Sequence, residues 1–286
     1  MTFRNLVLCA FFACAAPLSA QASDTSFTAQ VSDLTKSVDA DVGIALVSND
    51  GKLLREFNSG KRFAMCSTFK LPLAAMALQD ARQGKYRLDH PLKFKKSDLD
   101  AYAPVATRYL PSGHMTVLEA VHASVQLSDN TAANLLLRQA GGPKVLTQAF
   151  RRWGDNVSRL DRNETTLNTN LPGDPRDTST PVAMAKLTAR LVYGTLLDKQ
   201  DRLSLERLLI GNQTGDNTIR AGVPSSWIVG DKTGSCERGG RNDLAFLRSP
   251  AGKKYVLAVY VNAPKIEAPK RDQLVAEITK LALIGF

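Results

Sequence analysis

The sequence is poor in residues that commonly form metal centres, and it lacks a long apolar run beyond its N-terminal segment. It has four cysteines and three histidines among 286 residues. The histidines, His90, His114 and His122, do not have the spacing of metal ligands, so we expect neither a metal nor a cofactor. No segment after residue 22 has the roughly 20 apolar residues that a membrane-spanning helix needs. We therefore expect no membrane span.

The balance of charge is basic but dispersed. The chain has 37 lysines and arginines against 27 acidic residues, a formal net charge of +10. Its densest basic run, "KFKK" at 93–96, is followed at once by Ser97 and Asp98. A nucleic-acid-binding protein concentrates basic residues on one face or helix. The dispersed pattern instead indicates a solvated surface, and no nucleic-acid partner is expected.

The N-terminus has the pattern of a secretory signal. Arg4 precedes an apolar run over 6–16, and the small-residue motif Ala20-Gln21-Ala22 follows. This order predicts a signal peptide over residues 1–22, removed on export. We therefore expect a soluble, monomeric protein exported across the inner membrane into the periplasm.

Removal of the signal leaves two of the four cysteines. Cys9 and Cys14 lie within residues 1–22, whereas Cys66 and Cys236 lie in the mature chain. A lipoprotein attached through Cys14 is the weaker alternative, because two phenylalanines precede it where small or aliphatic residues are expected. An even pair in an oxidising compartment makes a Cys66–Cys236 disulfide the leading interpretation.

Strand patterns occur at both ends of the chain and helical patterns between them. Two strands at one end and three at the other favour one sheet that encloses an inserted helical domain. The predicted fold is α+β, with a five-stranded antiparallel sheet flanked by helices. The strands are expected at 42–48, 52–57, 227–230, 243–249 and 255–261, a last helix at 268–283, the sheet domain at 23–64 plus 213–286, and the all-helical domain at 65–212.

The segment 161–181 shows neither helical nor strand periodicity. It is rich in Asp, Asn, Thr, Pro and Gly. Loops longer than about 12 to 15 residues in compact domains are usually functional or disordered. A pair between Arg162 and Asp177 would bridge the ends of this loop and hold it in order.

Ser67 and Lys70 lie at the start of a strongly apolar stretch, which indicates a buried helix. Residues three apart share a helix face, so the amine can meet the hydroxyl. A serine hydroxyl is a weak nucleophile and needs a neighbouring base. For these two residues alone, an N-cap serine with a solvated lysine is the better interpretation, because so short a pattern arises by chance.

Two further motifs are equally weak in isolation. Ser128-Asp129-Asn130 precedes a helical run and suits an N-cap, but it also offers a proton-shuttling hydroxyl and an amide that can bind a carbonyl. Lys232-Thr233-Gly234 suits a strand end, but it also offers a cation, a hydroxyl and an unobstructed edge strand along which a ligand can lie.

The ordered set of three motifs resembles the serine β-lactamases and penicillin-binding proteins over essentially the whole mature chain. Within that superfamily the loop sequence "ETTLN", Glu164 to Asn168, resembles the Glu-x-x-Leu-Asn element of class A β-lactamases. In that family the Glu and Asn hold the water that hydrolyses the acyl-enzyme. Penicillin-binding proteins generally lack this element.

The resemblance implies a role for each matching residue. Ser67 attacks the β-lactam carbonyl, and the backbone amides of Ser67 and Ser235 form the oxyanion hole. Ser128 protonates the leaving nitrogen. Glu164 is the deacylation base, whereas Lys70 and Glu164 remain competing candidates for the acylation base.

The resemblance also implies a substrate-binding set. Asn130 binds the substrate amide, and Lys232, Thr233, Gly234, Ser235 and Arg241 border the substrate, four of them as a site for its carboxylate. A surface-strand arginine is the alternative for Arg241. Tyr102 lies near an aromatic position at the mouth of the family's cleft, and a packed surface tyrosine is the alternative there.

The two cysteines resemble the disulfide of class A carbapenemases, and both would flank the active site. The expected substrates are therefore penicillins, cephalosporins and carbapenems. Some carbapenemases have an arginine where this chain has Thr218, and here Arg241 would substitute. The alternatives are an extended-spectrum β-lactamase without useful carbapenem turnover, a DD-peptidase, and a β-lactam sensor domain.

Overall fold

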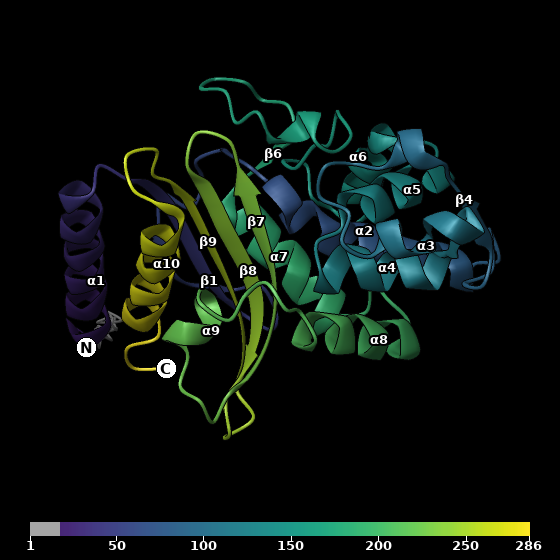
Figure 1. The fold of residues 1–286 in the computed structure, drawn as a ribbon. Coiled ribbons are helices and arrows are strands. Elements are labelled where there is room, and N and C mark those ends of the chain that lie inside the picture. The colour runs from purple at the N-terminus through teal and green to yellow at the C-terminus, as the bar shows by residue number, and fades with distance from the viewer. Residues whose placement is uncertain (1–17) are drawn as a thin grey trace, which may run out of the picture.

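A five-stranded antiparallel sheet built from both ends of the chain organises the protein. The computed structural model describes residues 18–286, and the order of its main sheet is β2-β1-β9-β8-β7 (Figure 1). This confirms the predicted fold class. The strands of this sheet are Asp41–Ser48 (β1), Leu53–Phe57 (β2), Ile228–Cys236 (β7), Gly240–Arg248 (β8) and Lys254–Asn262 (β9). Two small antiparallel pairs are formed by Phe63–Ala64 (β3) with Thr178–Ser179 (β6), and by Pro91–Lys93 (β4) with His114–Thr116 (β5).

Helices cover both faces of this sheet. Most of them occur in the part of the chain between β2 and β7. The helices are Leu18–Ser37 (α1), Lys70–Arg82 (α2), Ala106–Tyr109 (α3), Val117–Gln126 (α4), Asn130–Ala140 (α5), Pro143–Arg152 (α6), Pro181–Val192 (α7), Lys199–Ile210 (α8), Ile219–Gly222 (α9) and Ala268–Ala282 (α10). Four short 3₁₀ helices are Cys66–Phe69 (η1), Lys96–Asp98 (η2), Leu110–Ser112 (η3) and Thr166–Asn168 (η4). The helix expected at 268–283 is confirmed.

The central strands are apolar on both faces because helices cover both. α7 packs against β1 and β9, while α1 and α10 lie together over the opposite face (Figure 1). One apolar core joins sheet residues such as Phe246 and Tyr260 to the helices, and a second lies between the sheet and α10. Because the first core runs across the expected boundary, the division into sheet and helical domains stays a prediction.

The predicted signal peptide falls largely outside the described residues. Its first 17 residues are not described, and α1 begins at Leu18. Among the described residues, no helix has both the length and the apolar character needed to cross a membrane.

The loop 161–181 is an ordered element held by a buried carboxylate. Asp177 is fully buried and accepts hydrogen bonds from the backbone nitrogens of Asp161 and Arg162, at 2.7 and 2.9 Å. The Arg162 Nε atom lies 2.5 Å from the same carboxylate, so the expected bridge between the loop ends is confirmed. The Asp177 carbonyl also accepts a bond from the Met65 nitrogen, which ties the loop to the segment before Ser67.

We expect the Asp177→Asn variant to lose about 3 to 5 kcal/mol of unfolding free energy, because it removes the nearer carboxylate from a largely buried guanidinium and leaves only Asp174, at 3.9 Å. Asn tolerates the positive φ of 57° at this position, so the backbone conformation is retained. Urea denaturation measures the loss. The control is Asp89→Asn, which removes a carboxylate from an exposed pair with Arg87 and should change stability little. Equal stability of the two variants would contradict the role of Asp177.

Candidate active site

Ser67 lies in η1, a turn that is held on the sheet by side chains of β8 and β9. Thr68 Oγ1 is 3.0 Å from the Tyr260 hydroxyl, and Asn242 Nδ2 donates to the Ala64 carbonyl at 2.8 Å. No side chain caps η1. The N-cap interpretation of Ser67 is therefore wrong, and its hydroxyl remains available for other contacts.

Gly234 is the point at which edge strand β7 meets the Ser67 turn. A Cβ atom on Gly234 would lie 2.9 Å from both Cys66 Cβ and Ser67 N, closer than a side chain allows. Glycine therefore permits the backbone of β7 to approach η1. That Gly234 leaves room for a ligand along the strand stays a prediction, since the observed contact is with the protein itself.

The disulfide between Cys66 and Cys236 is present beside this approach. The two Cα atoms are 5.5 Å apart, and the bridge joins residues separated by 170 positions. It links η1 to the end of β7, directly next to Ser67. This confirms the pairing that the cysteine count favoured.

Lys70 is fully buried and meets three oxygen atoms that come from two other segments of the chain. Its Nζ atom lies 2.8 Å from the Ser128 carbonyl, 2.6 Å from Asn130 Oδ1 and 3.0 Å from Glu164 Oε1. Burial lowers the pKa of Lys70, and the Glu164 carboxylate opposes that shift. The Glu164 carboxylate and the neutral oxygens favour the charged form of this amine, whereas burial favours the neutral form. The alternative of a solvated lysine is wrong.

The carboxylate of Glu164 lies between Ser67 and Asn168. Ser67 Oγ donates to Glu164 Oε1 at 3.4 Å, and Asn168 Nδ2 donates to Oε2 at 2.6 Å. The backbone of Glu164 is fixed at both its polar atoms by Asn134, at 2.9 and 3.0 Å. The hydroxyl of Ser67 thus bonds the loop carboxylate, whereas the expected contact was with the amine of Lys70.

Ser128 receives hydrogen bonds from two lysines. Lys232 Nζ lies 3.1 Å and Lys70 Nζ 3.4 Å from Ser128 Oγ. Lys232 is fully buried, and burial, helped by the charge of Lys70, lowers its pKa to about 7. Because the Ser128 oxygen accepts both bonds, its own proton remains free for donation. Asp129, rather than Ser128, caps α5.

Lys232-Thr233-Gly234 lies within β7, which extends to Cys236 instead of ending near Gly230 as expected. A chain of hydrogen bonds runs from Thr233 into the interior. Its hydroxyl is 2.5 Å from that of Thr214, which donates to Asn212 Oδ1 at 2.9 Å. Asn212 Nδ2 in turn donates to Asp231 at 2.6 Å, and Asp231 pairs with Arg220. This chain orients the Thr233 hydroxyl.

Arg241 on β8 is placed between two polar groups. Its Nε atom lies 2.5 Å from the Asp272 carboxylate of α10, and its NH1 atom donates to Ser235 Oγ at 3.1 Å. This position beside β7 contradicts an isolated surface arginine. Thr218 is fully buried and donates to Asp243, away from the surface.

Tyr102 and Asn130 form the remaining edge of the site. Asn130 Nδ2 donates to Asp100 at 3.1 Å, which fixes the orientation of the amide and leaves a second N–H. The Tyr102 carbonyl accepts a bond from the Asn130 nitrogen, while the tyrosine side chain is 51% exposed. A packed tyrosine is therefore wrong; stacking on a substrate stays a prediction.

The sequence alone did not predict a role for three residues of this arrangement, Asn134, Asn242 and Thr214. Asn134 lies one helical turn after Asn130, and an asparagine inside an apolar helix was the available signal. Asn242 directly follows Arg241 in the sequence. Thr214 carried no sequence signal, because its partners become neighbours only through folding.

Comparison with known proteins gives the class to which this arrangement belongs. A family model described as "Beta-lactamase enzyme family" matches residues 26–285. The chain belongs to this family and, within it, to the class A β-lactamases, enzymes that hydrolyse β-lactams.

Several individual proteins resemble the chain along nearly its whole length. Beta-lactamase Toho-1 from Escherichia coli is 42% identical over 95% of this chain and 92% of its own. Beta-lactamase OXY-2 from Klebsiella oxytoca is 39% identical over 92% of this chain and 91% of its own. Among solved structures, the last common ancestor of Gram-negative bacteria class A β-lactamase (GNCA4) is 43% identical. It covers 91% of this chain and 99% of its own, with a TM-score of 0.88.

Proposed function

We propose that the protein hydrolyses β-lactams through a Ser67 acyl-enzyme and a water activated by Glu164. The observation that carries this proposal is the buried contact of Ser67, Lys70 and Glu164, with Glu164 Oε1 within 3.4 Å of Ser67 Oγ and 3.0 Å of Lys70 Nζ. A nucleophile in reach of a base that a third group orients is the arrangement of covalent catalysis.

In the acylation step the Ser67 oxygen bonds to the lactam carbonyl carbon and the lactam C–N bond breaks. The proton lost by Ser67 passes to the enzyme, and Ser128 donates a proton to the departing nitrogen. Backbone nitrogens of Ser67 and Ser235 stabilise the oxyanion. The close approach at Gly234 supports this role, because it brings β7 against the nitrogen of Ser67.

Glu164 is the better-supported base for acylation as well as for deacylation. The hydrogen bonds and ion pair of Lys70 Nζ are with Ser128, Asn130 and Glu164, and none joins it to Ser67 Oγ among the described residues, so Lys70 has no direct path to the Ser67 proton. Glu164 already accepts the Ser67 hydroxyl. In deacylation Glu164 takes a proton from the water that attacks the ester, Asn168 helps to hold that water, and Ser67 leaves with a proton.

Replacing the two reacting groups should separate the steps. Ser67→Ala should abolish turnover of a chromogenic cephalosporin and form no adduct. Glu164→Gln should accumulate an acyl adduct, visible by intact-protein mass spectrometry, with turnover reduced by at least about 100-fold, the lower range for a lost general base. Glu277→Gln, which neutralises an exposed carboxylate on α10, is the matched control and should behave as wild type.

Wild-type turnover by Glu164→Gln would contradict the assignment of Glu164. A stable adduct on the wild-type protein would instead indicate a DD-peptidase or a β-lactam sensor.

The groups around β7 form the proposed site for the substrate carboxylate. Lys232 and Arg241 supply charge, and Thr233 and Ser235 supply hydroxyls. The bond from Arg241 to Ser235 supports this grouping. For Thr233 to donate to a carboxylate, its proton must turn away from Thr214.

The pKa of about 7 for Lys232 predicts a pH dependence. Lys232 is charged below that pH and neutral above it, so kcat/KM for benzylpenicillin should fall as pH rises from 6 to 9. kcat/KM reports ionisations of the free enzyme. Lys232→Arg, whose guanidinium stays charged throughout, should move the falling limb above this range. If kcat/KM of the Lys232→Arg variant falls over the same pH range as that of the wild type, the ionisation belongs to another group.

Penicillins and cephalosporins are the proposed substrates, and we extend the proposal to carbapenems. The extension rests on the Cys66–Cys236 bridge, which joins η1 to β7 at the reacting serine. The relatives named above lend it no support. We further propose export through residues 1–22 to the periplasm and action as a monomer.

Purified protein should decrease the absorbance of imipenem, and Ser67→Ala should not. The test compares imipenem with benzylpenicillin at the same enzyme concentration. If benzylpenicillin is cleared and imipenem persists, the carbapenem proposal fails. The extended-spectrum alternative then remains, while the β-lactamase activity itself is unaffected.

A further inference from the structure

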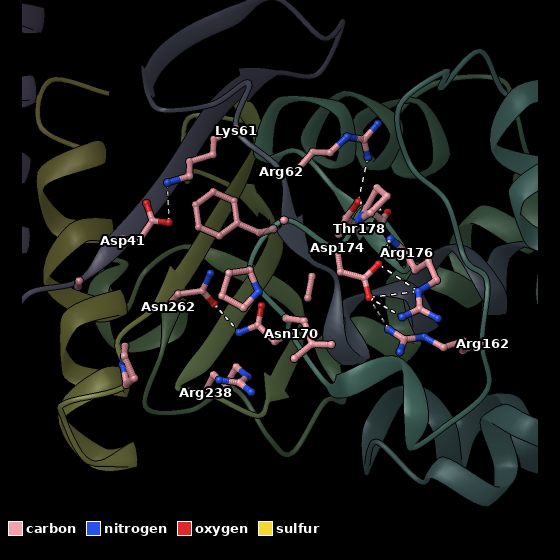
Figure 2. A pocket seen from close by; sticks show the side chains of 18 of the residues that line it. Asp41, Lys61, Arg62, Arg162, Asn170, Asp174, Arg176, Thr178, Arg238 and Asn262 are labelled. Atoms are coloured by element: carbon pink, nitrogen blue, oxygen red, sulfur yellow. Dashed lines mark hydrogen bonds and ion pairs between the residues drawn. The ribbon is translucent and has the colours of Figure 1, made fainter.

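A cavity of about 980 Å³ lies between the loop 161–181 and the sheet, and we name it the loop cavity. One wall is formed by loop residues 170–176. The other is formed by the start of β1, by residues 61–64 and by the end of β9 (Figure 2). This volume is at the upper end of the range for small-molecule sites.

The loop cavity is separate from the proposed active site. Ser67, Lys70, Ser128, Glu164 and Lys232 are absent from its lining. It nevertheless adjoins both parts of that site, because Ala64 lies three residues before Ser67 and Asn170 lies two residues after Asn168. A ligand in the cavity would therefore contact the loop that carries Glu164 without competing for Ser67.

Part of the lining is apolar. Phe63 is a buried residue of the lining, and the prolines Pro172, Pro175 and Pro264 contribute rigid aliphatic surface. Leu171 is 42% exposed, one of few large apolar side chains exposed to that degree in the described chain. Such a lining suits a hydrocarbon or aromatic body.

The charged part of the lining is short of carboxylates. Asp41 pairs with Lys61 at 2.7 Å, and Asp174 pairs with Arg176 at 2.7 Å and lies 3.9 Å from Arg162. A third acid of the lining, Asp39, pairs at 2.6 Å with Lys265, which is not itself a lining residue. The acidic oxygens are thus already engaged with cations.

Two guanidinium groups of the lining have no carboxylate partner among the described residues. Arg62 donates to neutral oxygens only, Thr178 Oγ1 at 2.9 Å and the Val157 carbonyl at 3.0 Å. Arg238, in the turn between β7 and β8, is exposed and makes no side-chain bond within residues 18–286. The two come from opposite sides of the cavity (Figure 2). A guanidinium binds carboxylates and sulfonates through paired N–H groups.

We propose that the loop cavity binds an organic anion with an apolar body, such as an aryl sulfonate or aryl carboxylate. Arg238 binds the anionic group, Arg62 adds to the favourable potential, and the apolar body lies against Phe63 and the prolines. The two walls are joined by Asn170 Nδ2, which donates to Asn262 Oδ1 at 2.9 Å and to the Glu237 carbonyl at 3.1 Å. A bound anion adds to these bonds and holds the loop against the sheet.

Fluorescence titration with anilinonaphthalene sulfonate tests the binding. We expect saturable binding that Arg238→Gln weakens about tenfold, the equivalent of one charge-assisted hydrogen bond. The matched control is Arg152→Gln, which removes an exposed arginine at the end of α6 and should leave the affinity unchanged. N-phenyl-naphthylamine, which lacks the sulfonate, should bind at least about tenfold more weakly. Equal affinities of the two variants would overturn the proposal.

A second measurement locates the probe and is independent of catalysis. In Glu164→Gln protein acylated by a penicillin, or in Ser67→Ala protein soaked with one, probe binding should persist. Hydrogen exchange of residues 170–176 should slow when the probe is bound. Displacement by the β-lactam, or unchanged exchange in this segment, would place the probe elsewhere and overturn the proposal. Neither result depends on whether the protein turns over β-lactams.

Discussion

The buried ammonium of Lys70 is the constraint on which the arrangement of the site depends. A charge fully removed from water must be matched by oxygens in its immediate surroundings. α2 alone offers none, so the Ser128 carbonyl, Asn130 and Glu164 must come to it from two other segments. Their convergence brings the loop carboxylate against the hydroxyl of Ser67. Three motifs that lie far apart in the sequence thus come together because one buried cation needs oxygen partners.

A second constraint is the contact between β7 and the turn that carries Ser67. Gly234 allows two backbones to touch, and the disulfide fixes the same contact covalently. Asn242 adds a hydrogen bond from β8 to the Ala64 carbonyl. The turn that carries Ser67 is consequently held by the sheet on one side and by α2 on the other, an arrangement that suits the proposed role of Ser67 as a preorganised nucleophile.

The loop 161–181 has two faces with different surroundings. On one face the Glu164 carboxylate contacts Ser67 and Asn168, and Asn134 fixes the backbone of Glu164. On the other face the loop borders a cavity whose lining has more cations than acids, and two of its arginines have no acidic partner within residues 18–286. Asp177 holds the ends of the loop together, so its middle, residues 170–176, is the part that a ligand from the second face can influence.

The sequence by itself determined the strands and the motif order. β1, β8 and β9 are apolar runs of the kind that a sheet covered on both faces buries, and the order of Ser67, Ser128, Glu164 and Lys232 resembles the motif order of the class A β-lactamases. Only the tertiary structure decided that β7 continues through Asp231 and Lys232, because their buried charges are satisfied by Arg220 and Ser128, which are remote in sequence. The tertiary structure likewise decided which groups Asn134, Asn242 and Thr214 contact. Local sequence records periodicity and propensity, whereas the partners of a buried polar group are chosen by the fold as a whole.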